Sequence, residues 1–80
     1  MNKLPTGVWI QFADFESYKS QRRELVDAIS DSHGEENVVI FLKSTKDITV
    51  LPVNLRVTAD EALLSRLGAI FGPDNVKLKR

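Results

Sequence analysis

Cysteine is absent from this sequence, and other features that would assign the chain to a specialised class are also missing. Without cysteine, disulfides and thiolate metal sites are excluded. Small secreted domains usually depend on such links, so an intracellular protein is favoured. No apolar run approaches the ~18 residues of a membrane-spanning helix, and the first residues, MNKLPTG, lack the hydrophobic core of a signal peptide. We therefore expect a cytoplasmic protein that has no membrane partner.

A net charge is also lacking, because 11 Lys and Arg residues balance 11 Asp and Glu residues. A domain built mainly to hold a phosphate backbone is usually clearly basic. The balance therefore argues against nucleic acid as the main partner, although it leaves room for a local basic patch. Apolar residues make up 42% of the chain and charged residues 28%, as in an ordinary globular protein. Its 80 residues are enough for one domain with a small core.

Groups that could perform catalysis are few and scattered. The single histidine, His33, lies at the end of a predicted helix, where a cation interacts favourably with the helix dipole. A structural role for it is therefore favoured over that of a general base. The four glycines never take the spacing of a phosphate-binding loop, and Glu35, Glu36 and Asp74 are typical of solvated turns. The sequence predicts no active site, no cofactor and no metal site.

The first amphipathic segment, residues 14–34, predicts a helix of about four turns. Asp14 or Ser17 can accept a hydrogen bond from the free amides at its start. Gly34 suits the left-handed residue that ends many helices. The apolar stripe expected to be buried consists of Tyr18, Leu25, Ala28 and Ile29.

The second amphipathic segment, residues 58–72, predicts another helix. Thr58 and Glu61 have the spacing of a capping box, in which each side chain bonds the other residue's amide. Gly72 followed by Pro73 is a strong signal for the end of the helix. The expected buried face consists of Leu63, Leu64, Leu67, Ile70 and Phe71.

The remaining segments are typical of strands. Residues 8–13 alternate, and residues 37–43 form a continuous apolar run that indicates a central strand. Residues 48–58 contain Pro52, which gives no amide hydrogen to a sheet, so this segment is an edge strand or two short strands bent at the proline. A bend there could add a fifth strand. Residues 75–80 are expected to form the last strand.

A repeated phrase relates the two halves of the chain. GEENVVIFLK in the first half and GPDNVKLKR at the end each follow a predicted helix, which gives two similar units in residues 8–43 and 53–80. Two such units predict an α+β fold, a two-layer ferredoxin-like βαββαβ sandwich with an antiparallel or mixed sheet. Both helices would lie on one face, and the third strand would be bent at Pro52. Residues 7–80 are expected to form a single domain, preceded by a disordered lead-in or linker in residues 1–6.

A binding surface is predicted on the open face of the sheet. If the alternate residues of the first strand face the helices, Trp9 faces outward with cations near it. Aromatic residues beside cations resemble the surface of RNA-recognition motifs, although the Lys/Arg-Gly-aromatic signature is missing. A neighbouring domain or a partner chain could instead cover the aromatic residues. The assignment of the two faces also depends on the strand register, because a shift of one residue exchanges them. The candidate residues are Trp9, Phe41, Arg56, Lys77 and Lys79.

The second half of the chain resembles a known family. Leu51–Pro52, the leucine spacing of residues 63–67, Gly72 and the closing residues 75–79 are similar to the extreme C-terminus of bacterial replicative DNA polymerase III alpha subunits of the DnaE type. Upstream, VWIQF and GEENVVIFL match strands of the same family. The resemblance extends over residues 7–80.

This resemblance implies a role in DNA replication without catalysis. The family's metal-binding aspartates lie far upstream, so nothing catalytic is carried over to this chain. The implied unit is a C-terminal accessory domain, following an oligonucleotide-binding-fold domain, that docks the tau subunit of the clamp loader or another replisome protein. The preceding domains of its own polymerase chain are further candidate partners. The alternative is a single-strand nucleic-acid-binding module that uses the five candidate residues, and a weak contact with single-stranded DNA is compatible with either role.

Overall fold

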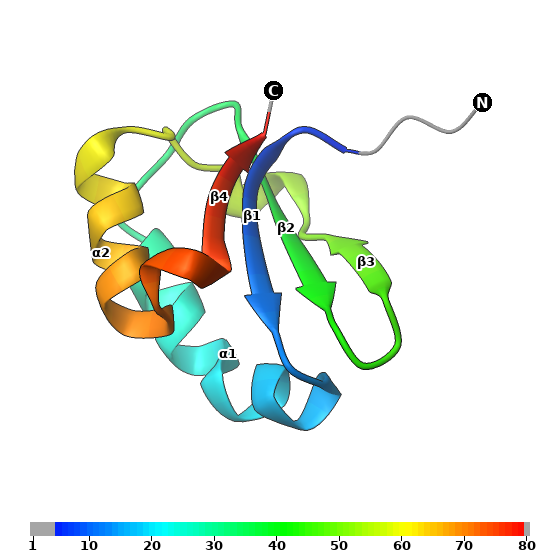
Figure 1. Ribbon diagram of the computed structural model, residues 1–80. Coiled ribbons are helices and arrows are strands. Elements are labelled where there is room, and N and C mark those ends of the chain that lie inside the picture. The colour runs from blue at the N-terminus through cyan, green and yellow to red at the C-terminus, as the bar shows by residue number, and fades with distance from the viewer. Residues whose placement is uncertain (1–4, 80) are drawn as a thin grey trace.

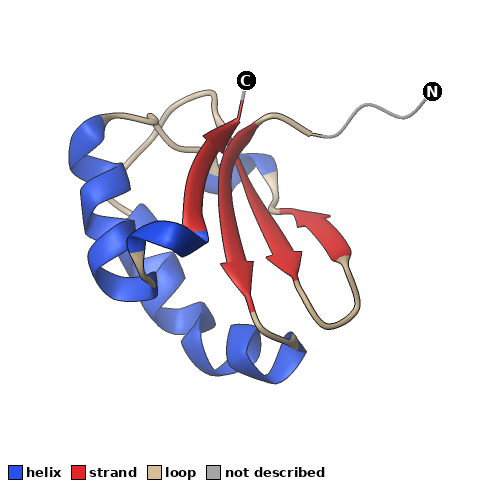
Figure 2. Cartoon of the chain, in the orientation of Figure 1, coloured by secondary structure: helices blue, strands red, loops and turns tan. Residues whose placement is uncertain are grey.

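A computed structural model describes residues 5–79 as two layers, one of helices and one of strands. Figures 1 and 2 show both long helices on the same side of the sheet, with the opposite sheet face uncovered by any helix. The predicted α+β fold with two helices on one face of the sheet is therefore confirmed. In chain order, the elements are β1 (Gly7–Phe12), α1 (Phe15–Ile29), β2 (Asn37–Leu42), β3 (Asp47–Val50), the 3-10 turn η1 (Val53–Leu55), α2 (Glu61–Phe71), the 3-10 turn η2 (Pro73–Asn75) and β4 (Val76–Lys79).

The sheet is mixed, with the order β3-β2-β1-β4. β1 runs parallel to β2 and antiparallel to β4, while β2 and β3 form an antiparallel hairpin. The order of elements along the chain is the predicted βαββαβ. In a split βαβ unit another strand separates the two parallel strands, whereas β1 and β2 are direct neighbours here. The ferredoxin-like strand order is therefore not confirmed.

The core lies between the helices and the inner face of the sheet. Val8, Ile10 and Phe12 of β1 are almost completely buried on this face, as the alternation of β1 predicts. The Phe12 ring meets the Tyr18 ring of α1 and the Phe71 ring of α2 edge-on, with centroids 5.3 and 5.4 Å apart. One aromatic side chain thus joins the sheet to both helices. β2 is buried on both faces except at Asn37 and Phe41, as expected of a central strand.

α1 is shorter than the sequence predicts. Its start is the expected one, because the Asp14 carboxylate accepts the amide hydrogen of Ser17 at 2.8 Å. Its last residue is Ile29, so the prediction that Gly34 ends the helix is wrong. Gly34 has another role: a Cβ there would lie 2.5 Å from the carbonyl oxygen of Val57. The glycine allows the loop after α1 to pass against the segment that leads into α2.

α2 begins with a different cap from the predicted one. The Asp60 carboxylate accepts the amide hydrogen of Leu63 at 2.9 Å, so Asp60 is the N-cap. The predicted capping box is wrong, because it requires Thr58 at the N-cap; the Thr58 hydroxyl instead donates to the carbonyl oxygen of His33 at 2.7 Å. The end is as predicted: Gly72 has φ +97°, and its amide donates to the carbonyl oxygen of Gly68.

The buried face of α2 is narrower than predicted. Leu63, Leu67 and Phe71 are buried, and Leu64 is half-buried. Ile70 is 40% exposed, so its predicted burial is wrong. Ile70 lies about 60° around the helix from the centre of the buried stripe, and it is in the last turn of the helix.

The hydrogen bond from the Leu63 amide to Asp60 stabilises the start of α2. Asp60→Ala is expected to lower the free energy of unfolding by about 1 kcal/mol, the usual effect of losing an N-cap. Glu61→Ala should change it by less than ~0.5 kcal/mol, since Glu61 contributes only a favourable interaction with the helix dipole. Urea unfolding measures both values. A larger loss for Glu61→Ala than for Asp60→Ala would favour the capping box and contradict the assignment to Asp60.

The third strand ends before the proline. β3 lies at the edge of the sheet, as predicted, but it stops at Val50, and the chain after Pro52 forms the turn η1. Pro52 has no amide hydrogen to extend the ladder, so the prediction of a strand bent at Pro52 is wrong. Val57 forms only an isolated antiparallel bridge with Glu36, and no fifth strand occurs in residues 5–79.

Two residues of the predicted lead-in are described, whereas residues 1–4 lie outside the described part of the chain. Pro5 and Thr6 belong to no helix or strand. Their carbonyl oxygens accept hydrogen bonds from the side chains of Trp9 and Asn37, at 3.0 and 3.3 Å. Within the described ranges, none of the helices has both the length and the apolar character needed to cross a membrane.

Candidate binding site on the open sheet face

The strand register places a second set of side chains on the face opposite the helices. Trp9 lies beside Val39 of β2 on one side and Lys77 of β4 on the other. Phe41 lies beside Ile48 of β3. Because neighbouring paired residues in a sheet point to the same face, these side chains share the open face. The predicted assignment of Trp9 to the face away from the core is therefore correct.

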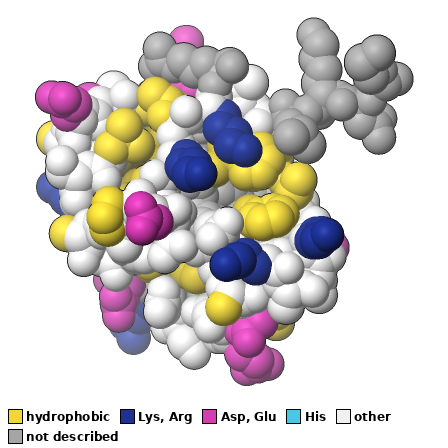
Figure 3. Space-filling model, viewed as in Figure 1, with side chains coloured by type: hydrophobic (Ala, Val, Ile, Leu, Met, Phe, Trp, Pro, Cys, Tyr) yellow, Lys and Arg dark blue, Asp and Glu magenta, His cyan; other side chains and the backbone are white. Residues whose placement is uncertain are grey.

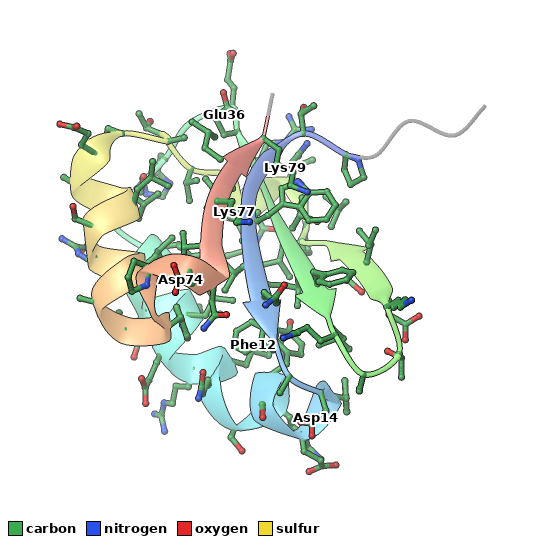
Figure 4. The ribbon with its side chains drawn as sticks, viewed as in Figure 1. Phe12, Asp14, Glu36, Asp74, Lys77 and Lys79 are labelled. Atoms are coloured by element: carbon green, nitrogen blue, oxygen red, sulfur yellow. The ribbon has the colours of Figure 1, made fainter. Side chains whose placement is uncertain are left out.

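A hollow of about 220 Å³ lies on this face. Figure 3 shows hydrophobic side chains gathered over the sheet, with Lys and Arg side chains on more than one side of them. Figure 4 shows Lys77 and Lys79 projecting from β4 toward the middle of the same face. Four of the five candidate residues line the hollow. Its lining residues are Trp9, Gln11, Phe41, Ile48, Asp74, Asn75, Lys77 and Lys79.

Trp9 forms the floor of the hollow and is only 6% exposed. Its indole N–H donates to the carbonyl oxygen of Pro5 at 3.0 Å. The Lys79 ammonium lies 4.3 Å from the ring centroid, a cation–π contact, and the Phe41 ring is tilted against it at 6.4 Å. Trp9 therefore lies on the predicted face, but in the free domain Lys79 covers its ring.

An apolar ledge, defined as Phe41, Ile48 and Val50, extends from the hollow to the sheet edge. Phe41 is half-buried, whereas Ile48 and Val50 are 38% and 44% exposed. Val50 pairs with the fully buried Val39, so it lies on the same face as Ile48. Sequence reasoning missed Ile48 and Val50. Their alternation with Thr49 was visible, but their face depends on the register between β2 and β3.

Arg56 is the candidate residue that does not line the hollow. It follows η1, and its Nε donates to the side-chain oxygen of Asn37 at 3.1 Å. Asn37 is the first residue of β2, and its own side-chain amide donates to the carbonyl oxygen of Thr6. Arg56 therefore holds the loop after η1 against the start of the sheet. Arg56 is thus not brought together with the other four candidate residues, and its part in binding stays a prediction.

Polar side chains at the end of the hollow near η2 were also missed. The Gln11 side-chain amide donates to the Asn75 oxygen at 3.3 Å, and the Asn75 amide donates to the carbonyl oxygen of Phe71 at 2.7 Å. These bonds join β1 to the turn between α2 and β4. Asp74, in that same turn, is the one acidic residue that lines the hollow.

The lysines that line the hollow are free to pair with acidic groups of a partner. Neither Lys77 nor Lys79 forms an ion pair with any residue of the 5–79 range, and both are exposed. In the same range, no three His, Asp or Glu side chains converge as metal ligands. His33 is exposed, and its carbonyl oxygen accepts the hydrogen bond from Thr58. The arrangement combines an apolar floor and ledge with the unpaired positive charges of Lys77 and Lys79.

Comparison with known protein families, curated proteins and solved structures found no match for this chain. The resemblance to the polymerase alpha subunits stays a prediction. Leu63 and Leu67, which carry much of it, are core residues. They define how α2 packs and do not line the hollow.

The contact between Lys79 and Trp9 can be tested in the free protein, since Trp9 is the only tryptophan. Lys79→Ala removes both the ammonium and the carbon stem that covers the ring. We expect the Trp9 emission to shift to longer wavelength, because water reaches the indole, and stability to fall by about 0.5–1 kcal/mol. Lys77→Ala is the matched control and should leave the emission unchanged. An unchanged spectrum for Lys79→Ala would contradict the contact.

Proposed function

We propose that this chain is a non-catalytic docking module whose open sheet face receives a partner protein. The observation that carries the proposal is the apolar ledge of Phe41, Ile48 and Val50, exposed beside a hollow on the face that no helix covers. A contiguous apolar patch rimmed by polar residues is typical of protein interaction sites. Burial of its partly exposed area against a partner supplies the favourable free energy of docking.

A single-strand nucleic-acid module is the second candidate. Lys77 and Lys79 beside two aromatic rings favour it, since such modules combine cations with rings on which bases stack. Three observations favour a protein partner instead. Trp9 is 6% exposed beneath Lys79 and offers no free ring face. Arg56 is bonded to Asn37 outside the hollow. The net charge of the chain is zero.

The resemblance in the sequence suggests which partner to test first. We propose that the domain is a C-terminal accessory domain of a replicative DNA polymerase III alpha subunit and that it docks the tau subunit of the clamp loader. Another replisome protein, or the preceding domains of the same polymerase chain, would occupy the same face. The docking proposal rests on the sheet face, and the choice of tau rests on the resemblance alone.

Calorimetric titration separates the candidates. The domain is titrated with the polymerase-binding region of tau and, separately, with a short single-stranded oligonucleotide, each at low and high salt. We expect tau binding to persist at high salt with only a modest loss of affinity, because an apolar contact supplies most of the free energy and salt screens only the exposed charges. Oligonucleotide binding should be weak and should fall steeply with salt. Tight, salt-sensitive binding of the oligonucleotide with no heat from tau would overturn the proposal in favour of the second candidate.

A further inference from the structure

The hollow has about the size needed to hold one large apolar side chain of a partner. Its volume of about 220 Å³ is below the ~300–1,000 Å³ typical of small-molecule and cofactor pockets. It is open at the surface of a sheet, with Trp9 at its floor, Phe41 beside Trp9 and Ile48 at its edge toward β3. Such a space accommodates one large apolar side chain delivered by a longer segment.

The charge around the hollow is asymmetric. Lys77 and Lys79 are two positions apart on β4, so both side chains project from the same face, at a spacing of about 7 Å along the strand. Against these two lysines the lining contains one carboxylate, Asp74, which lies in the η2 turn before β4. Neither lysine is paired with an acidic residue of the described chain. An occupant with negative charge beside its anchor would complement this arrangement.

We propose that the hollow binds a partner segment in which a large apolar side chain lies within a few positions of Asp or Glu side chains. This inference rests on the proposed docking function and adds the chemistry of the partner. The apolar side chain enters the hollow over Trp9 and Phe41, and the carboxylates pair with Lys77 and Lys79. A lysine is a point charge on a flexible stem, so it can follow a carboxylate in several geometries.

Lys79 contacts Trp9 in the free domain and a carboxylate of the partner in the proposed complex. In the free domain its ammonium lies over the Trp9 ring. When an acidic segment binds, the Lys79 ammonium pairs with a carboxylate of the segment and uncovers part of the Trp9 ring. The ring then contacts the large apolar side chain of the segment. The emission of Trp9, the only tryptophan, therefore reports occupancy of the hollow directly.

The test selects ligands without choosing their sequence in advance. Random peptides, displayed with their C-terminal ends fused so that no free carboxylate is present, are selected against the wild-type domain. The enriched peptides are then titrated against Lys77→Glu, which leaves the Lys79–Trp9 contact in place, and against the double variant Lys77→Glu/Lys79→Glu. The matched control is Lys19→Glu/Arg23→Glu on α1, where both residues are exposed and the change in net charge is the same as in the double variant. An oligonucleotide is titrated in parallel.

The expected peptides carry Asp or Glu near a large apolar residue and change the Trp9 emission. They should bind the wild type and the α1 control alike, and lose at least tenfold in affinity on Lys77→Glu. Replacing their acidic residue by Lys should restore binding to the Lys77→Glu variant.

Two results would overturn the inference in distinguishable ways. Peptides that change the Trp9 emission but show no preference for acids, or bind Lys77→Glu as well as the wild type, would leave the docking function intact and remove the acidic chemistry. If no peptide is enriched, or if the enriched peptides leave Trp9 unaffected, the inference and the docking of a protein at this face both fail. Binding of the oligonucleotide in that case would favour the nucleic-acid module.

Discussion

Ile10→Ala is expected to lower the free energy of unfolding by about 3–4 kcal/mol. Ile10 is fully buried in the middle of β1, which has β2 on one side and β4 on the other. Removing its side chain loses the free energy of burial and leaves a cavity that close-packed neighbours fill only in part. A domain of this size has a total stability of about 4–12 kcal/mol, so the variant should lose a large share of it, as a urea midpoint well below that of the wild type.

Ile70→Ala is the matched control, because the same side chain is removed from a position that is 40% exposed. We expect a loss below ~1 kcal/mol, partly offset by the higher helix propensity of alanine. Urea unfolding of both variants measures the difference. Comparable losses at the two positions would mean that Ile70 is buried, and would contradict the packing of α2.

Phe41→Ala is expected to weaken partner binding by at least ~30-fold, which corresponds to ~2 kcal/mol. Phe41 borders both the hollow and the ledge, and a half-buried aromatic ring at the centre of an interface is a typical hot spot. The domain should stay folded, since the ring lies outside the core between sheet and helices. Titration with the partner, with unfolding curves for the same samples, separates the two effects.

Phe15→Ala provides the control for the loss of an exposed aromatic ring. Phe15 is the first residue of α1, is 55% exposed, and touches the Tyr18 ring with centroids 6.2 Å apart. It does not line the hollow, so its replacement should leave the affinity within about twofold of the wild type. Equal losses for Phe15→Ala and Phe41→Ala would show that binding does not depend on the sheet face.

Much of the fold follows from local patterns in the sequence. Alternation assigns the two faces of β1 correctly, since Val8 packs in the core between sheet and helices and Trp9 lies on the opposite face. The end of α2 at Gly72 is also local, because the following proline cannot continue the helix. These features depend on residues that are neighbours in the chain, so a single sequence contains the information.

The sequence-based predictions that are wrong concern features that depend on a contact between residues far apart in the sequence. Thr58 and Asp60 can each cap a helix, and Thr58 is used otherwise because it meets the carbonyl oxygen of His33. Gly34 looks like the end of a helix, but its small size serves the close approach of Val57. The direct pairing of β1 with β2 is likewise a long-range choice, which the pattern of either strand alone does not specify.

In the candidate site, too, local patterns predict some features and long-range pairing determines the others. Trp9, Phe41, Lys77 and Lys79 were found because strand alternation places them on one face. Their arrangement around a single hollow, and the position of Lys79 over the Trp9 ring, depend on the register between β1 and β4. The contributions of Ile48 and Gln11 depend on β3 and on the η2 turn in the same way.

The most direct test of the central claim is an NMR titration that maps where a partner touches the domain. Isotope-labelled domain is titrated with the polymerase-binding region of tau at high salt. We expect shift changes that cluster on the open face, at Trp9, Phe41, Ile48, Val50 and Lys77, with the outer surface of α1 unaffected. A cluster on the exposed residues of α1 or α2, with the indole signal of Trp9 unchanged, would contradict docking on the sheet face.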